Sequence, residues 1–224
     1  MILDELRTLR ALSEDAAALL SSRGFVVVPD IVSSERIEKL CLAYDEAERT
    51  ATEPDKRIGS TSTRVSDFVN RGAEFADIYL NPSILEACCR VIGGPFKLSS
   101  FQSRTVRPRV RAQDLHVDVK HGSADWPLLG FILMVDEFRR DNGATRFMLD
   151  SGQEVPACGS RGSLLIYNGS TLHGHGANET DQTRRSLQGA FIPRMGKGSD
   201  FAARMSIDTR ARLSPTARWL LSLD

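Results

Sequence analysis

The chain has 224 residues and a formal net charge of zero, because 29 basic side chains balance 29 acidic ones. A balanced chain has no sequence-wide field that would attract nucleic acid or an anionic membrane, so neither is expected as a partner. The length suits one domain over residues 1–224 with a sizeable buried core. The sequence does not predict an oligomeric state.

The four cysteines and the amino terminus bear on the cellular compartment. Cys41, Cys88, Cys89 and Cys158 have no CxxC spacing and no histidine at zinc-finger distance, which favours small core residues in a reducing compartment. Residues 1–24 are charged throughout and lack the apolar core of a signal peptide, and no later run approaches the roughly 20 apolar residues that cross a bilayer. We expect a cytoplasmic protein.

The amino-terminal part, about residues 1–95, reads mostly as helix. Leucine and alanine at helical spacing predict a helix over 3–21 that ends at Gly24, and "FVVVP" predicts a strand after it. Helices are also expected over 33–53, with Ser33 or Ser34 as the cap, and over 81–94. Residues 54–75 show no period and predict a long loop, either a substrate-binding loop or a solvated connector.

From residue 96 onward the pattern changes to short strands separated by turns. The expected strands cover 96–106, 114–118, 128–138, 143–149, 162–168 and 184–194, and Asp141-Asn142-Gly143 is typical of a hairpin turn between two of them. Strands in sequence with little helix between them favour an antiparallel jelly roll. The predicted fold is thus mainly β with flanking helices (α+β), a cupin-like double-stranded β-helix with its core at about 96–194 and a tail at 195–224 that ends in a short helix.

A candidate metal site starts from "DLHVDVKHG", residues 114–122. Side chains on a strand alternate between its faces, so His116 and Asp118 would point to the same side. Taken alone, such a pair is more often a hydrogen-bonded or exposed polar pair than half of a metal site. The segment "NGSTLHGHGAN" lies far enough along the chain for a jelly roll to return His173 or His175 to the pair. Two imidazoles and one carboxylate are the ligands of non-haem Fe(II) oxygenases, which leave three metal positions open.

Arg184 lies 11 residues beyond His173, at the start of the last expected strand. A guanidinium matches a carboxylate in bidentate geometry and stays charged when buried, so it suits the far end of a dicarboxylate such as 2-oxoglutarate. Arg185 competes for this role, but adjacent strand residues face opposite ways and only one can point inward. The spacing favours Arg184.

In order along the chain, the HxD pair, "NGATRF", "HGHGAN" and "RRSL" resemble the phytanoyl-CoA dioxygenase family of Fe(II)- and 2-oxoglutarate-dependent oxygenases. The upstream "RGFVVVPDIVSSERIEKL" is similar to that family's amino-terminal segment, so the resemblance spans roughly residues 22–194. The run "FMLDSGQ" departs from the family's pattern after the NGAT turn. No basic cluster is evident for the phosphates of coenzyme A, so the family name assigns no substrate.

The resemblance implies a role for each matching residue. His116, Asp118 and His173 would bind Fe(II), and Arg184 would bind the distal carboxylate of 2-oxoglutarate, with O₂ as the other cosubstrate. The retained aspartate argues against halogenation, since halogenating relatives have a small residue there. We also consider Gln102 and Arg146 as contacts of the cosubstrate, although both could be ordinary surface residues.

The expected activity is oxidation of a C–H bond in a small-molecule metabolite, by hydroxylation, desaturation or ring formation, with release of succinate and CO₂. Two alternatives stay open: a cupin-like metalloprotein with non-oxidative isomerase or epimerase chemistry, and a binding protein that keeps the fold without turnover. The sequence does not identify the primary substrate.

Overall fold

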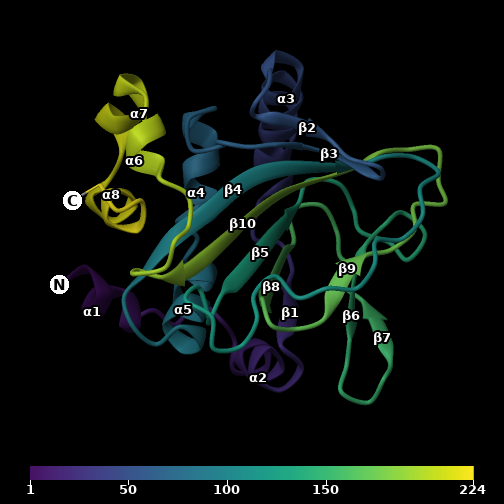
Figure 1. The fold of residues 1–224 in the computed structure, drawn as a ribbon, viewed down its shortest axis with the longest axis horizontal. Coiled ribbons are helices and arrows are strands. Elements are labelled where there is room, and N and C mark those ends of the chain that lie inside the picture. The colour runs from purple at the N-terminus through teal and green to yellow at the C-terminus, as the bar shows by residue number, and fades with distance from the viewer. Residues whose placement is uncertain (224) are drawn as a thin grey trace.

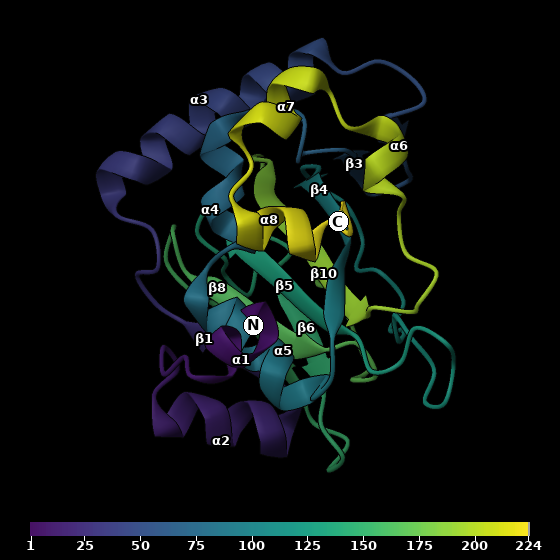
Figure 2. The same cartoon turned by 90° about the vertical axis from the view of Figure 1, so that its left-hand side faces the viewer.

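The computed structural model describes residues 1–223, which form a large sheet between a layer of helices and a small sheet. The seven-stranded sheet has the order β1-β8-β5-β10-β4-β3-β2, and the three-stranded sheet the order β7-β6-β9. Figure 1 shows the small sheet on the side away from the two termini, and Figure 2 shows helices α5 and α8 in front of the large sheet. The strands are β1 Phe25–Val28, β2 Lys56–Ile58, β3 Ser62–Val65, β4 Phe96–Val106, β5 Leu129–Met134, β6 Thr145–Met148, β7 Glu154–Pro156, β8 Leu164–Asn168, β9 His173–His175 and β10 Arg184–Pro193.

The helices lie at the two ends of the chain. They are α1 Ile2–Arg7, α2 Glu14–Arg23, α3 Ser34–Thr50, α4 Ala76–Tyr79, α5 Pro82–Val91, α6 Phe201–Arg204, α7 Ile207–Arg212 and α8 Pro215–Leu220, with a 3₁₀ turn, η1, at Ala73–Phe75. The single helix predicted over 3–21 was wrong, since Ser13 caps a new helix, α2, by accepting a bond from the amide of Ala16. The stop at Gly24 is confirmed, because that residue has the left-handed φ of 76° that glycine adopts without strain.

The other expected helices form near their predicted positions. Ser33 caps α3 and Asn81 caps α5, each through its side-chain oxygen. The tail helix appears as α8, with α6 and α7 before it; its predicted last residue, 224, lies outside the described residues. None of the helices within residues 1–223 is long and apolar enough to cross a membrane.

Three expectations about the strands need correction. The stretch 54–75 is not a plain loop, because β2 and β3 extend the large sheet beside β4. Residues 114–118 form no strand and make only a single bridge, from His116 to His173. The turn at residues 141–143 joins no hairpin: β5 belongs to the large sheet, whereas β6 pairs with β7 and β9 in the small one.

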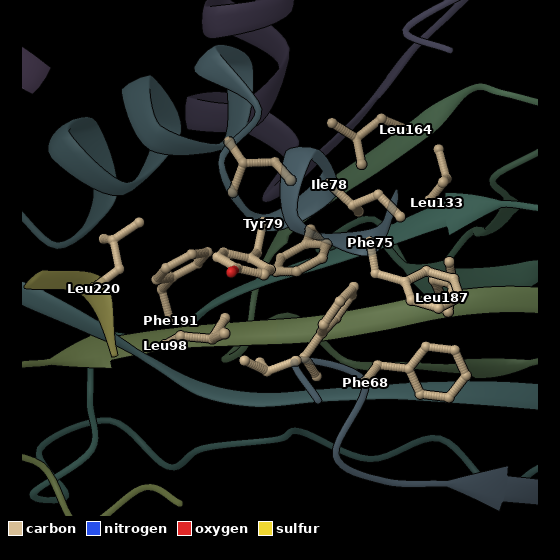
Figure 3. Close-up of a cluster of buried hydrophobic side chains, with 14 of the residues drawn as sticks. Phe68, Phe75, Ile78, Tyr79, Leu98, Leu133, Leu164, Leu187, Phe191 and Leu220 are labelled. Carbon is tan, nitrogen blue, oxygen red and sulfur yellow. The ribbon is translucent and has the colours of Figure 1, made fainter. Parts of the chain in front are cut away.

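The large sheet is buried on both faces, and alternation along its strands separates two cores. On β5, Leu129, Phe131 and Leu133 face the helices, while Ile132 and Met134 face the small sheet. Figure 3 shows part of the helix-side core, where aromatic side chains from the segment before α5 pack against leucines of the strands. The antiparallel layers and the alternation confirm the predicted jelly roll.

The strands β1, β2 and β3 come from the part of the chain before residue 95, so the large sheet joins the amino-terminal part to the jelly-roll core. Cys41 and Cys88 are buried as expected, and all four cysteines are free. Cys158 was expected in the core but is exposed, because it lies in the loop between β7 and β8.

Candidate metal and cosubstrate site

His116, Asp118 and His173 come together between the two sheets. One ligand atom from each lies within 4.8 Å of the others. The Nε2 atom of His173 is 3.6 Å from Oδ2 of Asp118, and Nε2 of His116 is 3.8 Å from Oδ1 of the same carboxylate. Four strands, β5 to β8, intervene between the two segments in the sequence, and the sheet brings them back together.

Backbone hydrogen bonds hold these segments in register although residues 114–118 form no strand. The amide of His116 donates to the carbonyl of His173, and the amide of His173 donates back, each at 2.9 Å. The amide of Asp118 donates to the carbonyl of Gly169 at 2.8 Å. Gly174 leaves room for the backbone of residues 114–118, since a Cβ at position 174 would lie 3.1 Å from the carbonyl oxygen of Asp114.

Each imidazole of the cluster is oriented through its other nitrogen. Nδ1 of His116 lies 3.1 Å from the carbonyl of Asp114, and Nδ1 of His173 lies 2.8 Å from the carbonyl of Thr171. A ring that donates through Nδ1 leaves the lone pair of Nε2 free for a metal. Burial lowers the pKa of His173, which favours the neutral form that binds metals.

Tyr167 fixes the carboxylate of the cluster. Its hydroxyl donates to Oδ2 of Asp118 at 2.8 Å. Burial, followed by the charge of Asp118, raises the pKa of Tyr167, so the hydroxyl stays protonated and remains a donor. Gly130 lies opposite on β5, and a Cβ there would come within 2.2 Å of the tyrosine ring. The glycine therefore leaves the space that the ring occupies.

The cluster opens into a cavity of about 290 Å³ lined by β4, β10 and the small sheet. The side chain of His173 is 7% exposed, whereas those of His116 and Asp118 are 38% and 30% exposed, so access to the cluster is from their side. Gln102 lines the same cavity.

Arg184 is fully buried in the wall of this cavity and has no acidic partner among the described residues. Its Nη2 donates to the carbonyl of Gly143 at 2.8 Å, and its Nη1 donates to Oγ of Ser186 at 3.2 Å, while its Nε has no hydrogen-bond partner within residues 1–223. Burial, together with the charge of Arg104, lowers the pKa of Arg184 to about 9. A buried cation without a carboxylate is costly unless a ligand supplies one.

Two residues from the sequence predictions lie elsewhere. Arg185 points away from the cavity and binds Asp136 and Asp45. Arg146 is absent from the lining of the cavity; it pairs with Glu154 and donates to the backbone carbonyl of Gln113.

His175 lines the cavity but does not join the cluster. Its Nε2 lies 2.9 Å from Oγ1 of Thr61 and its Nδ1 lies 2.7 Å from the carbonyl of Gly176, so both ring nitrogens are engaged.

The sequence reasoning missed Tyr167, Arg64 and Arg104, all of which line the cavity. Arg104 follows Gln102 by two residues on β4, and this spacing of two could have indicated that both face inward. Nothing local marks Tyr167, because its partner Asp118 is 49 residues away in the sequence.

The fold and the cluster together define the class of protein: a jelly roll with two imidazoles and one carboxylate on one face of a metal position, as in non-haem Fe(II) oxygenases. The model of the family described as "Phytanoyl-CoA dioxygenase (PhyH)" matches residues 20–153 and 148–186. The chain belongs to this family.

Curated relatives agree with this family assignment, and solved structures agree with the fold. Dioxygenase trt7 of Aspergillus terreus is 27% identical over 209 residues, covering 80% of this chain and 73% of the relative. HygX of Streptomyces hygroscopicus, solved with nickel and 2-oxoglutarate bound, superposes with a TM-score of 0.67 at 16% identity, over 82% of this chain and 88% of its own. SnoK, a non-haem α-ketoglutarate-dependent carbocyclase from nogalamycin biosynthesis, gives 0.71 at 16% identity, over 88% and 92%.

The residues present fit the metal and the cosubstrate of this class. Two imidazole nitrogens and a carboxylate oxygen suit Fe(II), and three coordination positions would remain open toward the cavity. The unpartnered guanidinium of Arg184 suits a carboxylate. The chain is a non-haem iron dioxygenase of the 2-oxoglutarate-dependent class.

Proposed function

We propose that this protein oxidises a C–H bond of a small-molecule metabolite, with hydroxylation as the expected outcome, and releases succinate and CO₂. His116, Asp118 and His173 hold Fe(II), and Arg184 binds the distal carboxylate of 2-oxoglutarate. One observation carries the proposal: a cluster of two imidazoles and a carboxylate opens into the same cavity as a buried guanidinium that has no acidic partner.

Iron, 2-oxoglutarate and O₂ supply the oxidising power for C–H cleavage when they are bound. The residues of the chain hold and orient these groups. The carbonyls of Asp114 and Thr171 fix the two imidazoles so that both Nε2 atoms face the metal position. Tyr167 holds one oxygen of Asp118 and leaves the other free.

The guanidinium of Arg184 orients the distal carboxylate of 2-oxoglutarate. It is already fixed by the carbonyl of Gly143 and the hydroxyl of Ser186, so little side-chain entropy is lost when a carboxylate binds. Its unpartnered Nε lies in a buried environment, where a charge-assisted hydrogen bond is stronger than in water. The result is a cosubstrate held at both ends.

The kind of oxidation depends on which C–H bond the cavity presents, and SnoK is described as a carbocyclase. The two alternative functions make different predictions, one about Arg184 and one about the consumption of 2-oxoglutarate. A cupin-like metalloprotein with non-oxidative isomerase or epimerase chemistry has no need for that guanidinium, and a binding protein on the same fold would not consume 2-oxoglutarate.

The test is turnover of 2-oxoglutarate in the absence of a primary substrate. Protein loaded anaerobically with Fe(II) and 2-oxoglutarate and then exposed to O₂ is expected to form succinate and CO₂ slowly, and Asp118→Ala is expected to abolish this, because two imidazoles alone leave the metal poorly held. Asp150→Ala is the matched control, since Asp150 is exposed and lies in the turn after β6. Equal succinate formation by Asp118→Ala and the unmodified protein would contradict the proposal.

A further inference from the structure

The cavity that holds the metal cluster has more positively charged side chains than the bound metal and cosubstrate would neutralise. Arg64, Arg104 and Arg184 all line it, and Asp118 is the one carboxylate among its described lining residues. Fe(II) with Asp118 and the dianion of 2-oxoglutarate has a net charge of minus one, which Arg184 balances. Arg64 and Arg104 are then left without a counter-charge.

The sheet register sets these two arginines side by side. Arg64 on β3 is directly opposite Arg104 on β4, and Arg104 is in turn opposite Ser186 on β10. Residues that face each other across antiparallel strands point to the same side, with Cβ atoms about 4.5–5.5 Å apart. Like charges in this position destabilise the sheet, so the pair has a cost that folding alone does not explain.

Neither guanidinium has an acid to offset that cost. The guanidinium of Arg64 makes no hydrogen bond or ion pair with any other residue of the described chain, 1–223. Nη2 of Arg104 donates only to the neutral amide oxygen of Gln113 at 2.8 Å, and its Nε is buried without a partner among those residues. Burial, followed by the charge of Arg64, lowers the pKa of Arg104 to about 10.

A second cavity, of about 280 Å³, adjoins the first. It shares Arg64, Ser100 and Gln102 with the metal cavity and is also lined by residues of α6, including Phe201. Arg64 therefore lies at the junction of the two cavities, and a molecule that fills the second can reach the arginine pair.

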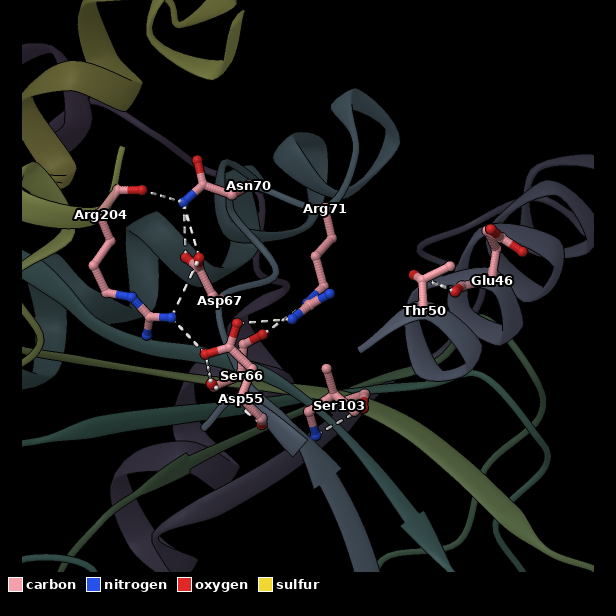
Figure 4. A network of polar contacts seen from close by, with 10 residues as sticks. Glu46, Thr50, Asp55, Ser66, Asp67, Asn70, Arg71, Ser103 and Arg204 are labelled. Carbon is pink, nitrogen blue, oxygen red and sulfur yellow. Dashed lines mark hydrogen bonds and ion pairs between the residues drawn. The ribbon is translucent and has the colours of Figure 1, made fainter. Parts of the chain in front are cut away.

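The acidic side chains of the second cavity are mostly committed to other partners. Figure 4 shows Asp55 between Arg204 and Arg71, with Asn70 donating to Asp67. These contacts tie the segment before β2 to the carboxyl-terminal α6 and hold the wall of the cavity. The third acid of the lining, Asp200, caps α6 by accepting from the amide of Ala203, and none of the three forms an ion pair with Arg64.

We propose that the primary substrate is an organic carboxylate whose acid group binds Arg64 and Arg104 at the junction, while the rest of the molecule occupies the second cavity. The inference rests on the proposed function, because it assigns Arg184 to the cosubstrate. Two guanidinium groups on neighbouring strands can each donate to one carboxylate, and the anion removes the repulsion between them.

The experiment compares benzoate with benzamide, which have nearly the same shape but differ in charge. Binding is measured by calorimetry on protein loaded with Ni(II) and saturating 2-oxoglutarate, so that the Arg184 site is filled. We expect benzoate to bind at least about tenfold more tightly than benzamide, which corresponds to about 1.4 kcal/mol. Arg64→Gln and Arg104→Gln should each remove this preference. Arg64→Lys should retain part of it, and the exposed Arg140→Gln should leave it unchanged.

Three results would overturn the inference: equal binding of the two probes to the unmodified protein, a preference that survives both glutamine variants, or a larger loss of 2-oxoglutarate affinity than of benzoate affinity in Arg64→Gln. The last result would assign the pair to the cosubstrate. Failure of the proposed function has a different signature, because the unmodified protein would then give no charge-transfer band with Fe(II) and 2-oxoglutarate under anaerobic conditions, whatever benzoate does.

Discussion

The hydroxyl of Tyr167 provides the sharpest test of how the carboxylate of the cluster is positioned. Tyr167→Phe removes one hydrogen bond of 2.8 Å to Oδ2 of Asp118 and leaves the ring in place. A hydrogen bond to a charged group contributes about 1.5–3 kcal/mol, and loss of a partner that orients a metal ligand costs about 10–100-fold in metal affinity. The side chain of Asp118 is 30% exposed, so water can replace part of the bond. We therefore expect the lower end, about tenfold weaker Fe(II) binding.

The assay is an anaerobic titration of metal-free protein with Fe(II) at saturating 2-oxoglutarate, followed through the visible charge-transfer band. Tyr79→Phe is the matched control, because Tyr79 is 1% exposed and lies in the helix-side core, away from the cavity. The variant and the control should melt at similar temperatures. If Fe(II) affinity in Tyr167→Phe stayed within about twofold of the unmodified protein, the tyrosine would not orient the metal ligand, and its contact with Asp118 would be incidental.

Two further substitutions test the cosubstrate site and a buried carboxylate. Arg184→Gln removes a buried cation. Because truncating one partner of a buried charge pair costs about 2–5 kcal/mol, 2-oxoglutarate should bind at least about 30-fold more weakly, with Fe(II) affinity unchanged. An unaltered 2-oxoglutarate titration would refute the assignment. Burial raises the pKa of Glu86, but bonds from the Leu12 amide, Arg90 and the Ala11 amide together lower it below 4.5. Its ionised form thus stabilises the fold above that pH, and the stabilisation is lost as the pH falls through the folded pKa. Glu86→Gln should cost about 1 kcal/mol in urea unfolding at about pH 7 and much less at about pH 3; a cost independent of pH would show that the charge has no part in it.

Much of the fold could be predicted from local pattern. Capping residues such as Ser33 and Asn81 mark helix starts through bonds to amides only a few residues away, and β4 forms over the predicted residues 96–106. The break between α1 and α2 was missed because the apolar spacing continues through it. The polar strands β2 and β3 were missed because they lie at the edge of the large sheet and show no apolar alternation. Backbone pairing of β3 with β4, and not an apolar sequence pattern, places them in the sheet.

Part of the site was also predictable from local pattern. The HxD pair and the HGxGxN motif are local in sequence, and their order is similar to that of a known family, so His116, Asp118 and His173 could be named in advance. The same-strand argument behind the pair was wrong in its detail, since a single bridge to β9 aligns these residues. Gln102 could be placed by strand alternation, whereas Arg146 could not, because its partner Glu154 comes from β7, a strand that the sequence did not predict.

The sequence by itself placed several strands, such as β4, and named the members of the His116, Asp118 and His173 cluster, because alternation, caps and short motifs act over a few residues. Only the tertiary structure decided that Tyr167 donates to Asp118, that Arg184, unlike Arg185, has no acidic partner among the described residues, and that Arg64 and Arg104 face each other. These facts depend on register between strands distant in sequence, and register is set by how whole sheets bury their faces.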